Sequence, residues 1–233
     1  MKAVILAGGK GVRLKPYTTH FPKPLMPVGD KPILEILIEK LKEAEIYDII
    51  ITTGHLSEMI NVLMGDGSKV GVKIKYSLED KPLGTAGPLD LLRDDLTEDF
   101  ILINGDVLSD LNFSEMIKFH KKNNNAATIG SIERTVFVDF GLVKLDSKNM
   151  YQGWEEKPTL KYLVSMGIYV LSPLALNCLP KGEFFNIPDL IQALHNNNEK
   201  VMGYKHKGYW LDIGRREDYE SACKSYNENS DIK

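Results

Sequence analysis

Cysteine is almost absent from this sequence. Two occur among 233 residues, Cys178 and Cys223, and neither lies in a CxxC or another metal-ligand spacing. This excludes a disulfide framework of the kind that staples small secreted domains, and it excludes a cysteine-ligated zinc site. Unpaired cysteines are typical of a reducing compartment. We therefore expect a cytoplasmic protein.

Long hydrophobic runs are also missing. The N-terminal run 2–7 (KAVILA) places a lysine before apolar residues but stops at Gly8-Gly9. It is too short for the apolar region of a signal peptide and far too short to cross a bilayer. No other stretch approaches the length of a membrane span, so we expect no membrane partner.

Charge of one sign is not in excess. The chain has 29 lysines and arginines against 32 aspartates and glutamates, a formal net charge of −3. Proteins that bind nucleic acid along a broad surface usually carry a basic excess, so we expect no nucleic-acid partner. A local basic site for a phosphate group remains compatible with this balance.

Repeats, low-complexity stretches and linker-like boundaries are absent as well. With 43% hydrophobic residues, the chain has ample material for a core. A length of this order favours one large domain. We expect a single domain over residues 1–226 and a mostly polar tail over 227–233.

The first half of the sequence contains a regular alternation of strands and helices. Short apolar runs at 2–7, 48–53 and 100–104 are typical of strands buried in a parallel sheet. Residues 33–45 repeat apolar side chains at helical spacing. Further helices are predicted at 58–64, 89–94 and 114–123, and a further strand at 73–76. This order predicts βαβ units, and hence an α/β fold with helices on both faces of a mainly parallel sheet.

The second half has a more mixed pattern. Strands are predicted at 126–132, 140–145, 151–155, 163–171 and 200–204, and helices at 187–196 and 217–224. The segments 140–145, 151–155 and 163–171 are typical of an antiparallel addition. We expect a small antiparallel lobe beside the main sheet.

A glycine-rich loop follows the first predicted strand, in the segment 6–14 (LAGGKGVRL). Ligands of open α/β sheets bind beyond the carboxyl ends of the strands, and glycines let the backbone approach a phosphate chain there. The third glycine of the dinucleotide fingerprint is replaced by Leu14, and no GxxxxGK[ST] pattern occurs. A nicotinamide-dependent oxidoreductase is therefore disfavoured. Taken alone, such a loop is equally compatible with a structural turn.

Three charged residues stand out by their surroundings. Lys23 lies between two prolines in the segment 21–25 (FPKPL), so its cation sits on a stiffened backbone where a phosphate could bind; the alternative is a solvated loop lysine. Asp106 follows an apolar strand, and Asp212 follows Trp210-Leu211. A carboxylate in apolar surroundings is costly unless it is paired or metal-bound. The alternative role for either aspartate is to cap a turn or helix.

The opening LAGGxGxRL followed by PKPL closely resembles that of the sugar-1-phosphate nucleotidyltransferases. Further segments that resemble this family occur in its order: 82–87 (PLGTAG), 104–106 (NGD), 156–158 (EKP), 165–169 (SMGIY) and 209–214 (YWLDIG). The resemblance implies a Rossmann-like, glycosyltransferase-A-like catalytic domain with a small antiparallel sugar-binding lobe. It also implies that an NTP and a sugar 1-phosphate react to give an NDP-sugar and pyrophosphate with Mg²⁺ as cofactor. A homodimer is a further expectation.

The resemblance also implies a role for each matched residue. Arg13 would brace the leaving phosphates and Lys23 would hold the α-phosphate. Asp106 and Asp212 would hold Mg²⁺. The nucleotide would be bound by Leu6, Ala7, Gly8, Gly9, Gly11, Glu79, Pro82, Gly84 and Thr85. The sugar phosphate would be bound by Asn104, Gly105, Gly141, Glu156, Lys157, Ser165 and Gly167. For Glu156 and Lys157, the alternative is a surface ion pair in a turn.

The sequence departs from the family pattern at two positions. Val12 replaces the usual threonine, which removes a hydroxyl near the phosphates but leaves the backbone N–H groups. Ser165 replaces the asparagine that many relatives carry, which indicates a different sugar or a different hydrogen bond to its phosphate. The segment 182–189 (GEFFNIPD) resembles a subgroup with mannose-like or aminosugar guanylyltransferases; its phenylalanines would otherwise simply anchor the next helix.

The residue before the PLGTAG loop that would face the base is Glu79. A carboxylate can accept hydrogen bonds from guanine N1–H and the 2-amino group, so GTP is the expected nucleotide. The alternative is a solvated loop acid beside Asp80 and Lys81. Mannose 1-phosphate or an aminosugar 1-phosphate is the expected co-substrate. The remaining alternatives are a thymidylyl-, uridylyl- or cytidylyltransferase for another hexose or heptose 1-phosphate, and a non-catalytic nucleotide-sugar sensor. The charged residues that a sensor would lose are all present.

Overall fold

A seven-stranded sheet forms the centre of the computed structural model, which describes residues 1–9, 11–54 and 56–228. The strand order is β12-β8-β11-β6-β1-β4-β5. The strands are β1 (Lys2–Leu6), β4 (Asp48–Thr53), β5 (Lys73–Leu78), β6 (Phe100–Asn104), β8 (Ala127–Phe137), β11 (Thr159–Leu171) and β12 (Val201–His206). Only β11 runs antiparallel to its neighbours in this sheet. The predicted mainly parallel sheet is confirmed.

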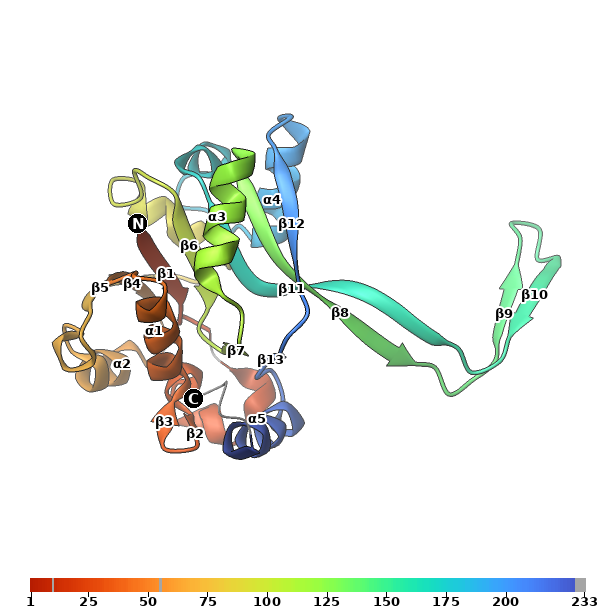
Figure 1. The fold of residues 1–233 in the computed structure, drawn as a ribbon, viewed down its shortest axis with the longest axis horizontal. Coiled ribbons are helices and arrows are strands. Elements are labelled where there is room, and N and C mark those ends of the chain that lie inside the picture. Colours follow the sequence, from red (N-terminus) through yellow and green to blue (C-terminus); the bar gives the residue numbers. More distant parts are fainter. Residues whose placement is uncertain (10, 55, 229–233) are drawn as a thin grey trace.

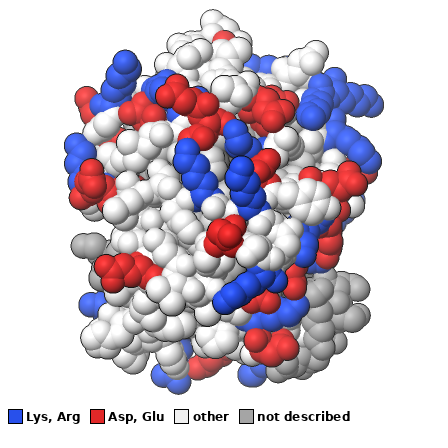
Figure 2. All heavy atoms as spheres, turned by 90° about the vertical axis from the view of Figure 1, so that its left-hand side faces the viewer, with Lys and Arg blue, Asp and Glu red and all other residues white. Residues whose placement is uncertain are grey.

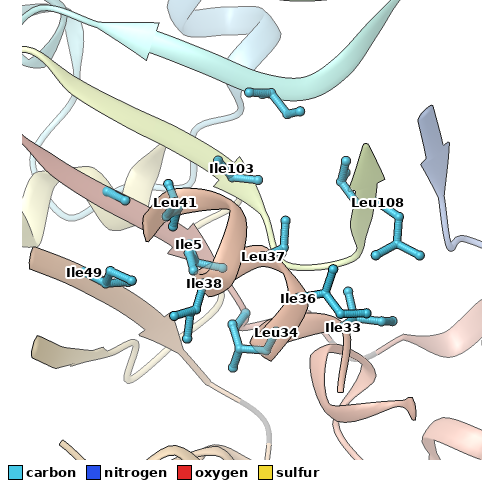
Figure 3. Close-up of a cluster of buried hydrophobic side chains, with 14 of the residues drawn as sticks. Ile5, Ile33, Leu34, Ile36, Leu37, Ile38, Leu41, Ile49, Ile103 and Leu108 are labelled. Atoms are coloured by element: carbon cyan, nitrogen blue, oxygen red, sulfur yellow. The ribbon is translucent and has the colours of Figure 1, made fainter. Parts of the chain in front are cut away.

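Helices cover both faces of the sheet (Figure 1). They are α1 (Ile33–Glu43), α2 (Ser57–Met64), α3 (Phe113–Asn123), α4 (Ile187–Asn196) and α5 (Arg216–Glu228). On one face, α1 packs its apolar side over Ile5, Ile49 and Ile103 (Figure 3). On the other face, Val4 of the same strand β1 joins a cluster that includes Leu190 of α4. Because successive side chains of β1 point to opposite, covered faces, the strand is apolar throughout rather than alternating.

One segment predicted as an α-helix forms a 3₁₀ helix instead. Residues 89–94 were expected to be α-helical, but the chain forms a 3₁₀ helix at Gly87–Leu92 with a proline in its first turn. A segment of six residues is too short to form a stable α-helix alone. It is held by tertiary bonds instead: Arg93 donates to the carbonyl oxygens of Leu176 and Leu179 at 2.6 and 3.0 Å.

Three two-stranded sheets complete the fold: β2 (Pro27–Val28) with β3 (Lys31–Pro32), β7 (Val107–Ser109) with β13 (Trp210–Asp212), and β9 (Leu142–Leu145) with β10 (Tyr151–Glu155). The first two pairs were not predicted, because two- and three-residue strands have no readable periodicity. Helix α5 buries Ala222 and Tyr226 in the same core cluster as α1. It continues to Glu228, and the rest of the predicted tail lies outside the described residues.

A β-ribbon extends far out of the molecule (Figure 1). Strands β8 and β11 are both longer than the predicted 126–132 and 163–171. Their inner halves are buried, whereas residues 133–137 and 159–163 are almost all exposed. We call residues 133–163, which include the β9–β10 hairpin at the tip, the arm, and the rest of the chain the body.

The face of the body opposite the arm carries Lys and Arg side chains interspersed with Asp and Glu (Figure 2). No single-sign patch is visible on this face. Within the described residues, no helix has the length and apolar character needed to cross a membrane.

Candidate active site

Two adjoining cavities lie at the carboxyl ends of the central strands. The small cavity has a volume of ≈ 250 Å³ and is lined by the glycine loop, Arg13, Lys23 and Asp106. The large cavity, ≈ 650 Å³, is lined by Glu79 and the loop that follows it. Leu6, Gly9 and Asp106 line both, so the two cavities form one continuous trough. Its position fits the rule that open α/β sheets bind ligands beyond their strand ends.

A lysine and two aspartates meet at the small cavity. Lys23 opens a short 3₁₀ helix, Lys23–Leu25, and its Nζ donates to Asp106 Oδ2. The same Nζ lies 3.9 Å from Asp212 Oδ1. The Lys23 side chain is only 11% exposed, so this charge is held in place by its partners rather than solvated.

The pairing of β7 with β13 brings the two aspartates together although they lie far apart in the sequence. Asp106 directly precedes β7, and Asp212 pairs with Val107 in the register of the two strands. The Ile213 N–H also donates to the Asp106 carbonyl at 3.0 Å. These backbone bonds hold Asp212 beside Asp106; of the two, Asp106 lines the cavities and Asp212 does not.

The two aspartates suit a hard divalent cation. Asp106 Oδ1 is buried and has no hydrogen-bond partner among the described residues. Burial raises the pKa of Asp212, the nearby charge of Asp106 raises it further, and Lys23 and Arg13 oppose the rise. No group of three or more His, Cys, Asp or Glu that could hold a metal occurs in the described part of the chain. Two carboxylates with open positions match the way Mg²⁺ is held at nucleotide sites, where phosphates and waters complete the shell.

The glycines around the trough differ in their surroundings and in their backbone conformation. A Cβ on Gly8 would lie 2.6 Å from Glu79 Oε1, and one on Gly105 would lie 2.8 Å from the Leu6 carbonyl oxygen. These two positions therefore allow close packing beneath the trough. Gly9 has no atom within 4 Å of its Cβ position and lines both cavities. Gly11 has φ +58°, a conformation that favours glycine.

Glu79 is anchored through one oxygen. Its Oε2 accepts a hydrogen bond from the Leu83 N–H at 3.0 Å, while its Oε1 faces Gly8. Burial raises the pKa of this carboxyl, and the Leu83 bond partly opposes the rise. The alternative of a fully solvated loop acid does not describe this half-buried carboxylate, which lines the large cavity.

The PLGTAG loop is clasped by residues about a hundred positions further on. The Ala86 and Gly87 N–H groups both donate to the Phe185 carbonyl, at 2.9 and 3.0 Å. Thr85 Oγ1 accepts from the Ile187 N–H at 2.9 Å, so this hydroxyl is already used to hold the loop on the start of α4. Pro82, Gly84 and Thr85 all line the large cavity.

Replacing Gly84 by alanine is expected to destabilise this clasp. Gly84 has φ +82°, and a Cβ there would lie 2.5 Å from the Phe185 carbonyl oxygen. We expect Gly84→Ala to lower the free energy of unfolding by roughly 2–4 kcal/mol. Denaturant unfolding measures this, with Gly9→Ala as the control, because that methyl group meets no neighbour. Equal stability of the two variants would show that the clasp is loose.

The residues predicted for the sugar phosphate are divided between the body and the arm. A Cβ on Gly167 would lie 2.5 Å from Asn104 Nδ2, so these two residues touch, and Asn104 and Gly105 line the trough. Ser165 Oγ and Tyr169 Oη lie 2.8 Å apart. The remaining three residues, Gly141, Glu156 and Lys157, all lie in the arm.

Within the arm, Gly141, Glu156 and Lys157 contact other arm residues. Trp154 Nε1 donates to Glu156 Oε2 at 2.8 Å, and a Cβ on Gly141 would overlap the Trp154 ring. Lys157 Nζ lies 3.1 Å from Asp139 Oδ1. None of the three lines either cavity.

Several lining residues were not predicted from the sequence: Thr52, Gly54, Phe184 and Gly214. Of the two neighbouring phenylalanines, Phe185 packs against the core, but Phe184 is 62% exposed at the large cavity. The sequence alone does not distinguish Phe184 from Phe185, because the contact between this segment and the PLGTAG loop is visible only in the folded structure. Gly54 could have been found from its position after the strand 48–53.

The chain belongs to the nucleotidyl transferase family, whose model matches residues 2–229. The resemblance stated from its motifs is confirmed. A mannose-1-phosphate guanyltransferase from Yarrowia lipolytica is 35% identical over 237 residues, which cover 97% of this chain and 64% of the relative. A UTP–glucose-1-phosphate uridylyltransferase from Synechocystis is 31% identical over a match that covers 96% of this chain and 63% of the relative. The chain thus spans a little under two thirds of the length of these curated relatives.

A solved structure has the same architecture. HddC from Yersinia pseudotuberculosis, complexed with GMP-PN, has a TM-score of 0.75 and 27% sequence identity, and the match covers 97% of this chain and 99% of that one. The predicted fold class, an α/β nucleotidyltransferase fold with small antiparallel sheets, is confirmed.

Proposed function

We propose that this chain is a sugar-1-phosphate guanylyltransferase, which converts GTP and mannose 1-phosphate or an aminosugar 1-phosphate to a GDP-sugar and pyrophosphate. The observation that carries the proposal is the trough. Its small end is lined by Arg13, Lys23 and Asp106, with Asp212 beside Lys23, and its large end holds a half-buried acid beside a glycine loop. The guanylyltransferase relative and the GMP-PN complex of a structural neighbour support this choice of nucleotide.

The reaction requires positioning and positive charge more than covalent chemistry. An oxygen of the sugar phosphate attacks the α-phosphorus of the NTP, and the bond to the β-phosphate oxygen breaks as pyrophosphate leaves. The attacking oxygen is already an anion, so no general base is needed. The barrier comes from bringing anions together and from charge on the transferring phosphoryl group.

Arg13 and Lys23 supply cations for those charges. The guanidinium of Arg13 matches the paired oxygens of the leaving phosphates, and Lys23 offers a compact charge to the α-phosphate. Lys23 now contacts Asp106 and lies beside Asp212, so it would exchange its bond to Asp106 for one to substrate. Gly9, with open space over its Cα, lets the phosphate chain lie against the backbone.

Nucleotidyltransferases of this family generally use a divalent metal, and we propose that Asp106 and Asp212 hold Mg²⁺ here. The ion would neutralise phosphate charge and fix the phosphate geometry. The buried, unpartnered oxygen of Asp106 and the raised pKa of Asp212 support this assignment.

Glu79 is proposed to select guanine. Because one relative is named as a uridylyltransferase, the choice of base is tested directly. We expect Glu79→Gln to lower kcat/KM with GTP by about 10- to 100-fold, since one bidentate base contact is worth about 1–3 kcal/mol. The loss with UTP or dTTP should be smaller. Steady-state assays with the three nucleotides measure the ratio. An equal loss with all three would show that Glu79 only supports the loop through Leu83.

The function itself is tested by pyrophosphate release with Mg²⁺. GTP, dTTP, UTP, CTP and ATP are crossed with mannose, glucose, glucosamine, N-acetylglucosamine and heptose 1-phosphates. Release with GTP and one sugar supports the proposal and names the product. Release with another nucleotide would correct the base. No release with any pair, in a folded protein that binds nucleotide, would favour a nucleotide-sugar sensor.

We also propose that residues 1–226 form one catalytic domain and that the protein acts in the cytoplasm. The packing of α5 into the main core supports the first. The two cysteines, both unpaired in the structure, support a reducing compartment.

A further inference from the structure

The arm is an extension of the main sheet. Strands β8 and β11 stay paired along their whole shared length, from Thr159↔Phe137 at the outer end to Leu171↔Ala127 inside, with one irregularity between Ser165 and Tyr169. Because the same strands form the core and the arm, the sheet sets the direction in which the arm leaves the body (Figure 1).

The arm has one mostly apolar face, whose inner end joins the core and whose outer part is exposed. Residues paired across antiparallel strands lie on the same face. Leu160 pairs with Val136, Tyr162 with Arg134 and Val164 with Ile132, so these residues share one face, which continues outward from the core. Arg134 is the one charged member, and its guanidinium lies over the Trp210 ring of the body. The opposite face is mixed: Lys161 pairs with Thr135, Leu163 with Glu133, and Thr159 with Phe137. On β11 this face has an apolar or aromatic residue at each of positions 160, 162 and 164, which is the pattern of a buried sheet surface.

Exposed large hydrophobic side chains are concentrated in this arm. More than half of the large hydrophobic side chains that are exposed come from residues 133–163, although the arm is a small part of the chain. Phe137 is 61% exposed, Phe140 76% and Trp154 57%. A two-stranded ribbon on its own is marginally stable in water, so this surface is expected to be covered in the functional protein.

The arm also holds its tip away from the trough of its own body. Gly167 touches Asn104 at the trough, and the strand then runs outward through Ser165 to Thr159. Seven extended residues span about 23 Å, at roughly 3.3 Å per residue. That distance is far longer than a lysine side chain, so Lys157, beyond Thr159, does not reach the trough of its own body in this conformation. The trough lacks the part of the sugar-phosphate site that the arm carries.

We propose that two copies of this chain pair through their arms, so that each arm covers its apolar face against the partner copy and brings Glu156 and Lys157 to the partner's trough. A second copy is the occupant that fits, because an identical body offers a trough that is not lined by its own Glu156 and Lys157. A two-fold axis satisfies both chains at once, since each gives an arm and receives one. The assignment of sugar-phosphate binding to Glu156 and Lys157 rests on the proposed function.

Complementation between two inactive chains tests this arrangement. Asp106→Asn disables the body but keeps the arm intact, and Lys157→Ala disables the arm but keeps the body intact. The two chains are co-expressed with different tags and purified on both. With arms exchanged, one of the two sites in each heterodimer has an intact Asp106 and an intact Lys157, so we expect about half of the wild-type rate per dimer. The control pair, Asp106→Asn with Lys23→Met, carries both changes in the bodies and should show no recovery.

Two results would overturn the exchange. A heterodimer as inactive as its parents would mean that each arm bends back over its own body. Full activity of Lys157→Ala alone, or a fully active monomer in sedimentation at assay concentrations, would mean that the tip completes no partner site.

Sedimentation of the whole chain tests the pairing separately from catalysis. We expect Tyr162→Asp, on the apolar face, to weaken self-association at least about tenfold. Thr135→Asp, on the opposite face of the same ribbon, should leave self-association unchanged. If the wild type transfers no nucleotide to any sugar phosphate, the proposed function fails, while these two variants still decide whether the arms pair. Equal association of both variants with the wild type would overturn the pairing.

Discussion

Asp106→Asn is expected to reduce pyrophosphate release by at least about 10³-fold while leaving the fold intact. The substitution removes one negative charge and changes almost no volume. Oδ1 of Asp106 is buried without a partner among the described residues, so no protein hydrogen bond is lost there. The rate is measured at saturating Mg²⁺, and thermal unfolding is measured in parallel.

The control for this prediction is Asp94→Asn, which removes the same charge from an exposed position outside both cavities. It should retain the wild-type rate. A near-normal rate for Asp106→Asn at saturating Mg²⁺ would refute the metal assignment. A large fall in the unfolding midpoint would instead mean that Asp106 is needed for the fold through Lys23.

Lys23→Met is expected to lower kcat by about 10³-fold, because it removes the cation proposed to stabilise the transferring phosphoryl group. It should also lower the free energy of unfolding by roughly 1–3 kcal/mol. Asp106 and Asp212 would face each other without the cation that now lies beside both. Single-turnover kinetics measures the first effect and denaturant unfolding the second.

The stability loss should shrink as the pH is lowered. Burial and the charge of Asp106 raise the pKa of Asp212, and Lys23 opposes that rise. Without Lys23, the folded-state pKa moves further above the unfolded value. At a pH between the unfolded-state and folded-state pKa of Asp212, the folded chain binds more protons than the unfolded chain. The free energy of unfolding therefore falls as the pH rises through the folded-state pKa, and the lost stability is regained below the unfolded-state pKa. The gap to wild type should therefore be larger at about pH 7 than at about pH 4.

Lys31→Met is the matched control for Lys23→Met. Lys31 also forms an ion pair, with Glu39 at 2.8 Å, but it lies outside both cavities. It should keep the wild-type kcat. A variant of Lys23 with unchanged kcat but reduced stability would show that Lys23 only neutralises the aspartates.

The sequence predicted the central sheet well because its signal is local. The runs 48–53 and 100–104 are strands with the predicted ends, and α4 begins and ends at the predicted residues. These strands are buried on both faces, which makes them continuously apolar and easy to recognise. The glycine loop, Lys23 and Asp106 lie at the strand ends where α/β sheets bind ligands, so their common location was also predictable.

Long-range pairings were not predictable in the same way. The short strands β7 and β13 carry no periodicity, yet their register places Asp212 beside Asp106. The outer halves of β8 and β11 were missed because charged residues such as Glu133 and Lys161 interrupt their apolar pattern. The resemblance placed Gly141, Glu156 and Lys157 at the sugar phosphate, but the direction of the arm is a property of the folded sheet.

The clasp between the PLGTAG loop and the start of α4 links two kinds of measurement. Thr85 accepts its bond from Ile187, 102 residues away, and that bond can persist only while the first turn of α4 is formed. A nucleotide that binds the PLGTAG loop while it is held on α4 therefore stabilises the conformations in which the first turn of α4 is intact. Amide hydrogens in α4 should exchange more slowly with solvent when the trough is occupied, even though the helix itself lines neither cavity.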